Sequence, residues 1–113
     1  MDESPLAQRL RRLPVATVCG REARIATASL SRLLGLAYLD LDEAGPGLLI
    51  PRCSSVHTFG MRFPLDIYFL GEETDLLAIR RGVPAYRFVS CRGAKAVLEI
   101  PAAEGGEFPP LCP

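Results

Sequence analysis

The residues best suited to chemistry are gathered in segment 53–66, which holds the only histidine of the chain. Cys53 and His57 could form a thiolate–imidazole pair, with Asp66 as the acid that orients the imidazole. His57 could also act as a general base oriented by Asp66 alone. In the structural alternative, His57 is a hydrogen-bonded structural residue and Asp66 caps loop amides or pairs with Arg62. An apolar strand follows at once, so the segment should lie at the mouth of a sheet, where rigid scaffolds present functional residues.

We therefore expect a candidate ligand-binding cluster of His57, Arg62 and Asp66 at one end of the sheet. The planar guanidinium of Arg62 suits a carboxylate partner such as Asp66. If these two residues pair, His57 is left to face solvent or a ligand. Glu99 is a fourth candidate member, because it sits within an apolar strand and needs a partner if it points inward. Arg62 and Lys95 are the candidates for that partner. No catalytic residue can be assigned.

A bound metal or cofactor is not expected. Zinc needs three or four ligands in tight geometry, and one histidine with four scattered cysteines is a poor ligand set. The acidic loop around Asp40, Asp42 and Glu43 lacks the alternating carboxylates and the final glutamate of an EF-hand. The cysteines form no C-x-x-C pair and are expected to be reduced, buried small side chains.

The bulk composition describes one small globular domain. The chain has 113 residues, of which 49% are hydrophobic, and thirteen basic residues balance thirteen acidic ones. A zero formal charge gives no long-range attraction for nucleic acid, and it is compatible with a homodimer. The N-terminus has no apolar signal region, and no apolar run is long enough to span a bilayer. A soluble, cytoplasmic protein without a membrane partner is expected.

Short elements rich in β-strand are predicted along the chain. We expect a helix or arm within residues 1–14, a single β-rich domain over 15–102 and a loose tail rich in proline and glycine over 103–113. The main helix should run from about 28 to 36. Strands are expected on both sides of the turn at 19–22, and at 48–50, 65–70, 76–80, 85–89 and 94–100.

This pattern predicts an α+β, β-rich fold: an antiparallel sheet or partly closed barrel with one main helix packed on it. The expected core follows from the apolar stripe of the helix and from the strand periodicity. Its members are Leu30, Leu33, Leu34, Ile67, Phe69, Leu98 and Ile100.

The segment from His57 to Leu70, HTFGMRFPLDIYFL, resembles the signature of an uncharacterised bacterial and archaeal family, domain of unknown function 192 (uncharacterised protein family 0127). The resemblance extends to RLLGL at 32–36, GLLI at 47–50 and AVLEIP at 96–101, and covers roughly residues 15–102. It implies a compact β-rich domain with one helix against a sheet or partly closed barrel. The family carries no agreed activity. After the Leu-Glu element the chain departs from relatives that continue with a glycine-aspartate strand.

Three classes of function remain open at this stage. The first is a small binding module that holds a small polar ligand or an extended peptide at the loop 53–66. The second is an accessory or structural protein that acts through its surface. The third is an enzyme that uses His57 with Asp66 or Cys53. A cavity at His57 with a second titratable group within hydrogen-bond reach favours the enzyme. A cavity without such a pair favours the binding module, and an exposed apolar patch favours the accessory protein.

Overall fold

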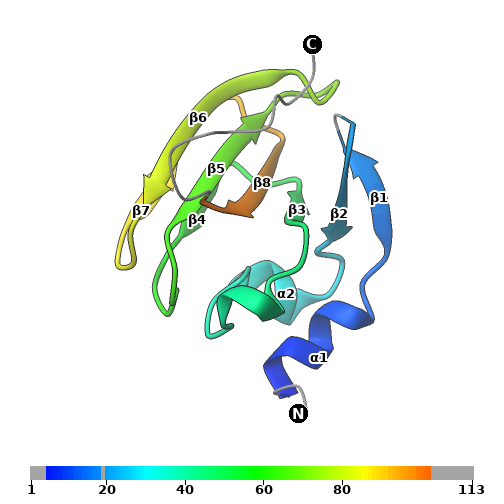
Figure 1. The fold of residues 1–113 in the computed structure, drawn as a ribbon. Coiled ribbons are helices and arrows are strands. Elements are labelled where there is room, and N and C mark those ends of the chain that lie inside the picture. The colour runs from blue at the N-terminus through cyan, green and yellow to red at the C-terminus, as the bar shows by residue number, and fades with distance from the viewer. Residues whose placement is uncertain (1–4, 19, 103–113) are drawn as a thin grey trace.

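The computed structural model describes residues 5–18 and 20–102. Two short α-helices, α1 (Pro5–Arg11) and α2 (Ser29–Leu34), and a 3₁₀ turn, η1 (Leu41–Glu43), accompany eight strands (Figure 1). The strands are β1 (Val15–Val18), β2 (Arg21–Ile25), β3 (Leu48–Pro51), β4 (Ser55–His57), β5 (Leu65–Leu70), β6 (Leu76–Val83), β7 (Phe88–Ser90) and β8 (Ala96–Pro101). The expected tail at 103–113 lies outside the described residues.

Six strands form one mixed sheet in the order β1-β2-β3-β8-β5-β6. The fold is β-rich as predicted, but two predicted details of the sheet were wrong. It is not purely antiparallel, because β2 and β3 pair in parallel through Arg24↔Leu48 and Ile25↔Leu49. It also does not close into a barrel. The parallel pair arises because α2 and η1 separate the two strands, and such a crossover returns the chain in the same direction.

The sheet buries both of its faces around β5 and β8. All six residues of β5 are buried, as its nearly continuous apolar sequence predicts. Ile67 lies opposite Glu99 in β8 and belongs to one core, whereas Asp66 lies opposite Ile100, which belongs to the second core. Successive side chains of a strand point to opposite faces, so Glu99 and Asp66 lie on opposite faces of the sheet. The core positions predicted for Ile67, Phe69, Leu98 and Ile100 are confirmed.

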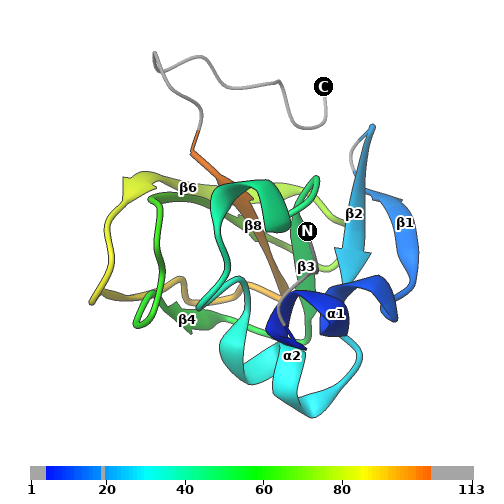
Figure 2. The ribbon, with the colours of Figure 1, turned by 60° about the horizontal axis from the view of Figure 1, so that its bottom comes forward.

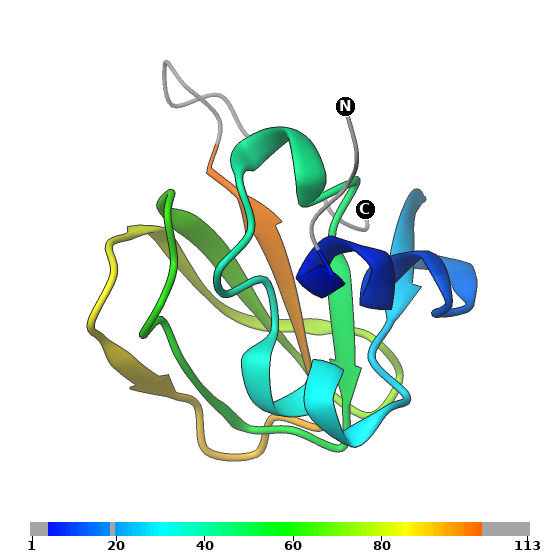
Figure 3. The ribbon, with the colours of Figure 1, turned by 90° about the horizontal axis from the view of Figure 1, so that it is seen from below.

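The helical layer covers the Glu99 face of the sheet and is smaller than expected. Figures 2 and 3 show α1 and α2 beside each other on one side of the sheet. The expectation of one main helix is wrong, because α2 has only six residues and ends at Gly35, whose φ of +58° leaves the helical region. Leu33 was also wrongly expected in the core: it is 66% exposed, and Leu36, beyond the turn, is the buried residue. Leu34 packs partly against the core, and the side chain of Leu30 is not described.

A separate two-stranded ribbon carries the polar segment of interest. Strand β4 pairs antiparallel with β7 through Ser55↔Ser90, Val56↔Val89 and His57↔Phe88. Strand β4 is not apparent from the sequence, because it has only three residues and two of them are polar. In Figure 1, β7 continues the path of β6 around to β4. The ribbon thereby holds His57 on a strand and not on a free loop.

The N-terminal helix is part of the packed domain. Leu10 and Leu13 are buried in the same core as the Glu99 face of the sheet. Arg9 donates from its NH2 group to the carbonyl oxygens of Gly35 at 2.8 Å and Ala37 at 3.3 Å, so α1 is joined to the turn that follows α2. Within residues 5–18 and 20–102, no helix is long and apolar enough to cross a membrane.

Candidate functional site

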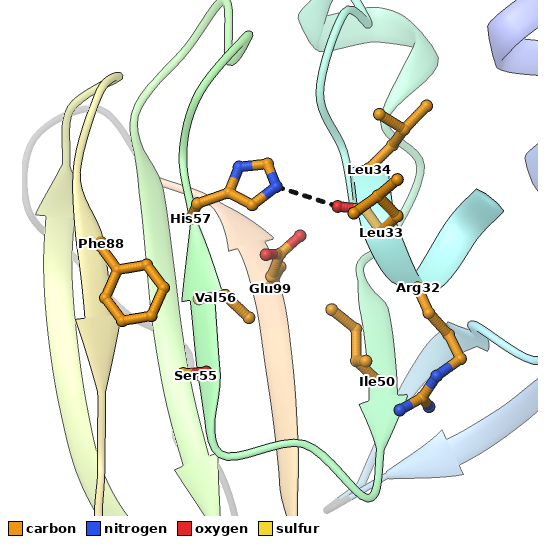
Figure 4. A pocket seen from close by; sticks show the side chains of 10 residues that line it. Arg32, Leu33, Leu34, Ile50, Ser55, Val56, His57, Phe88 and Glu99 are labelled. Carbon is orange, nitrogen blue, oxygen red and sulfur yellow. Dashed lines mark hydrogen bonds between the residues drawn. The ribbon is translucent and has the colours of Figure 1, made fainter. Parts of the chain in front are cut away.

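A cavity of about 240 Å³ lies between α2 and the β4–β7 ribbon. Its walls are mainly apolar side chains from four elements: Leu33, Leu34, Ile50, Val56 and Phe88. His57 and Glu99 supply the polar groups near its centre, and Figure 4 shows the imidazole ring beside the carboxyl group. An apolar hollow with a few polar groups is the usual form of a small-molecule site.

Glu99 is the buried acid of this cavity. Glu99 is only 1% exposed, and its Oε1 atom accepts a hydrogen bond from the backbone N–H of Leu36 at 3.3 Å. Burial raises the pKa of Glu99 to about 7, although the hydrogen bond from Leu36 and the positive charge of Arg9 both act to lower it. The desolvation of the charged carboxylate outweighs both stabilising contacts. The carboxyl group therefore changes its charge near neutral pH.

Gly35 makes room for the carboxyl group of Glu99. A Cβ atom at position 35 would lie 2.5 Å from Oε1 and 3.2 Å from Oε2 of Glu99. The close approach places the Leu36 N–H, one residue further along, within reach of Oε1. The glycine that ends α2 thus also positions the acid of the cavity.

Arg9 lies near Glu99 from the side of α1. Its NH2 group is occupied by the carbonyls of Gly35 and Ala37, while its buried Nε and NH1 atoms have no hydrogen-bond partner among the described residues. Burial lowers the pKa of the Arg9 guanidinium, and the charge of Glu99 acts in the opposite direction. The two charges are therefore coupled through space, without a direct ion pair between them in the described structure. The expected partners of Glu99, Arg62 and Lys95, do not fill this role.

His57 joins the ribbon to α2 across the cavity. Its Nε2 atom lies 3.1 Å from the carbonyl oxygen of Leu33, so Nε2 carries the proton and donates it (Figure 4). The other ring nitrogen, Nδ1, is buried and has no hydrogen-bond partner among the described residues. The ring also stacks on Phe59, with centroids 5.5 Å apart. The imidazole is thus held on two sides. It lines the same cavity as Glu99, but within residues 5–18 and 20–102 no hydrogen bond joins the two side chains.

The structure separates the other two candidate residues from this cavity. Arg62 does not pair with Asp66: its NH1 group binds Asp40 at 2.9 Å in an exposed ion pair. Asp66 is buried on the opposite face of the sheet, where it accepts a hydrogen bond from the N–H of Gly82 at 2.9 Å. The expected cluster of His57, Arg62 and Asp66 is therefore wrong, and Glu99, the fourth candidate, is the one that lies beside His57.

Asp66 has the properties of a structural carboxylate. Burial raises its pKa, whereas the hydrogen bond from Gly82 and the charge of Arg81 act to lower it. Burial also raises the pKa of Tyr68, two residues along the same face, and the charge of Asp66 adds to that effect. Asp66 lies within β5 and binds a backbone amide of the neighbouring strand β6, where a loop amide or Arg62 was the expected partner.

The geometry does not support either catalytic pair proposed from the sequence. Asp66 cannot orient His57 across the sheet. The thiol of Cys53 donates to the carbonyl oxygen of Ser55 at 3.1 Å, and the imidazole is bonded to Leu33. Residues 5–18 and 20–102 contain no group of three or more histidine, cysteine, aspartate or glutamate side chains arranged to hold a metal.

Sequence reasoning missed Leu33, Phe88 and Arg9 as members or neighbours of the site. RLLGL at 32–36 and AVLEIP at 96–101 are both part of the family resemblance, but nothing in the sequence shows that Gly35 and Glu99 are in contact. The contact between Gly35 and Glu99 could have been found from two sequence signals taken together: a glycine after a short helix, and an acid inside an apolar strand. Each feature requires a close partner, and each is the partner of the other.

Comparison with known proteins agrees with this fold. The family model of DUF192, described as Uncharacterized ACR, matches residues 16–107. The chain belongs to this family. The DUF192 match spans every strand from β2 to β8, and so includes both Glu99 and the ribbon. No curated protein matches the chain.

A solved structure similar to this DUF192 chain is a protein of unknown function from Novosphingobium aromaticivorans DSM 12444. The similarity covers 90% of this chain and 89% of that one, with a TM-score of 0.58 and 20% sequence identity. At this identity the likeness shows a shared fold and carries no function.

Proposed function

We propose that this domain is a binding module that holds a small ligand in the cavity between α2 and the β4–β7 ribbon. The observation that carries the proposal is the buried carboxyl group of Glu99 in a hollow with mainly apolar walls. Burial of an ionisable group costs free energy unless a partner compensates for it. Leu36 provides one hydrogen bond, to Oε1, and a ligand would provide further contacts.

The size and lining of the cavity set the scale of the ligand. A hollow of about 240 Å³ is somewhat smaller than typical drug-sized pockets, so it suits a molecule about the size of one substituted aromatic ring. Ile50 and Val56 offer it apolar contact, and Phe88 offers an aromatic ring near the ribbon. The ligand site thus involves β4, within the loop region 53–66 singled out from the sequence, and extends beyond it to α2 and β8.

The proposal can be tested with benzyl alcohol as a neutral, ring-sized probe. We expect millimolar binding, seen as chemical-shift changes of backbone amides around the cavity in ¹H–¹⁵N correlation spectra. Ser55 lines the cavity, so Ser55→Phe should fill it and abolish these changes. The matched control is Ser54→Phe at the exposed neighbouring position, which should leave them intact. Shifts that persist in Ser55→Phe, or that map to another face, contradict the proposal.

A second candidate function is an accessory role through protein contact. Tyr86 and Phe88 are 73% and 68% exposed. Phe59 stacks on His57 and contacts Tyr86 with its ring tilted by 55°. Exposed aromatic side chains gathered at one place are typical of interaction surfaces. With no net charge to oppose association, a second copy of the chain is the partner to test first. Sedimentation equilibrium should then show a dimer that is weakened in a Tyr86→Ser, Phe88→Ser variant; a monomer at all concentrations contradicts this role.

A further inference from the structure

We propose that the ligand of this cavity carries a positively charged amine, whose ammonium group binds the Glu99 carboxylate while its apolar body lies against Ile50, Val56 and Phe88. This inference deepens the binding function proposed above and rests on it. It concerns the chemical class of the ligand, which the presence of a cavity does not by itself define.

The first support is the character of the polar groups that face the cavity. Glu99 presents a carboxylate, which only accepts hydrogen bonds when ionised. Arg32, the cation of α2 that lines the cavity, is already occupied: its NH1 and NH2 groups donate to the carbonyl oxygens of Pro51 at 2.5 Å and Arg52 at 3.3 Å. The Nε2–H of His57 is likewise used by Leu33. The cavity therefore offers an acceptor without a free donor from these two side chains, and an anionic ligand would meet Glu99 unfavourably.

The second support is the position of Arg9, the charged group that faces Glu99 from α1. Its NH2 group donates to the carbonyls of Gly35 and Ala37, and it does not line the cavity. The charge of Arg9 favours the ionised form of Glu99 from behind the turn, whereas Arg32, which lines the cavity, is bonded to the carbonyls of Pro51 and Arg52. An ammonium group on that side would complete the neutralisation of the buried charge.

The third support is the aromatic ring of Phe88 on the ribbon. Phe88 lines the cavity together with Glu99, although it comes from β7 and Glu99 from β8 (Figure 4). A cation is attracted to the face of an aromatic ring, and the attraction is present even at an exposed site. An acid and an aromatic wall in one apolar hollow form a recognition pattern that suits an amine.

Binding of a cation must be linked to the proton on Glu99. The pKa of this carboxyl group is about 7, so below neutral pH the group is mostly protonated and must lose its proton to hold an ammonium ion. Arg9 acts on Glu99 from α1, and the other charged or titratable side chains of the cavity are His57 from β4 and Arg32 from α2. Measuring the same pH dependence in Glu99→Gln separates the contribution of Glu99 from that of all other groups.

The experiment compares three probes of one shape: benzylamine, benzyl alcohol and benzoate. We expect benzylamine to bind the wild-type protein at pH 8 at least tenfold more tightly than benzyl alcohol, and benzoate to bind most weakly. The affinity of the wild-type protein for benzylamine should fall about 100-fold between pH 8 and pH 5 as Glu99 takes up its proton. Glu99→Gln should lower the affinity for benzylamine to that for benzyl alcohol and remove the Glu99-linked pH dependence.

The outcomes distinguish this inference from the binding function on which it rests. If benzyl alcohol perturbs the cavity amides and benzylamine has no advantage, the amine class is wrong and the binding module stands. If benzylamine keeps its advantage in Glu99→Gln, the carboxylate is not its anchor and the inference is overturned. If none of the probes perturbs the cavity at millimolar concentration, both proposals fail.

Discussion

Oxygen Oε1 of Glu99 occupies the space that a Cβ atom on Gly35 would need. An added methyl group would lie 2.5 Å from it, at a backbone φ of +58°. We expect Gly35→Ala to lower the free energy of unfolding by at least ~1 kcal/mol more than Gly82→Ala, as measured by chemical denaturation. Gly82 is the matched control, because it has the same φ and no atom within 4 Å of the added methyl group. Equal losses in the two variants would show that only backbone strain matters.

The charge state of Glu99 should make the domain less stable as the pH rises. The pKa is about 7 in the folded protein against an ordinary value of 4.5, so the folded state holds the extra proton between these values. Stability is therefore greatest below about pH 4.5 with respect to this group and is lost as the pH rises to 7. The shift corresponds to about 3 kcal/mol as an upper estimate.

Glu99→Gln isolates this contribution. The free energy of unfolding at pH 5 minus that at pH 8 should be larger in the wild type than in the variant by up to ~3 kcal/mol. Asp66 also has a raised pKa, but it is present in both proteins and cancels in the comparison. An identical pH dependence in the two proteins would mean that Glu99 is not buried as described.

The two remaining candidate residues should differ in their effect on stability. Arg62→Ala breaks an exposed ion pair with Asp40, which should cost less than ~1 kcal/mol. Asp66→Ala leaves the N–H of Gly82 without its acceptor, which should cost ~1–3 kcal/mol. Thermal or chemical denaturation of the two single variants measures both values, and the reverse order would contradict the structure. Neither change should alter binding of a probe in the cavity.

Two large apolar side chains test the packing. Phe69 is fully buried in the core of the sheet, so Phe69→Ala should cost ~3–5 kcal/mol. Leu33 is 66% exposed on α2, and Leu33→Ala should change the free energy of unfolding by less than ~1 kcal/mol. Denaturant unfolding curves of the two variants provide the comparison. A large loss of unfolding free energy in Leu33→Ala would show that Leu33 is a core residue, as expected from the sequence.

The local sequence predicted the strands well where the pattern was long. LDIYFL at 65–70 is a nearly continuous apolar run, and it forms the fully buried β5. The turn after it was also expected, and Gly71 accepts from Thr74 and donates to Asp75 there. The three-residue strand β4 was missed, because SVH has no periodicity long enough to distinguish a strand from a loop.

The site could be predicted only in part, because its contacts join distant residues. Glu99 was recognised as an acid that would need partners, but those partners are Leu36 at a separation of 63 residues and the charge of Arg9. The second difficulty was to predict on which face of the sheet each acidic side chain lies. Adjacent positions on paired strands face opposite ways, so Asp66 and Glu99 are separated by the sheet although their strands are neighbours.

The position of β8 also determines the order in which the domain can be completed during synthesis. The sheet order β1-β2-β3-β8-β5-β6 places residues 96–101 between two halves made earlier in the chain. A ribosome-bound chain can pair β1 with β2 and β5 with β6, but the halves have no shared strand until β8 emerges. Such late, long-range pairing slows folding and leaves the open edges of β3 and β5 to be protected meanwhile. The final strand to join the sheet is the one that brings the Glu99 carboxylate to Gly35.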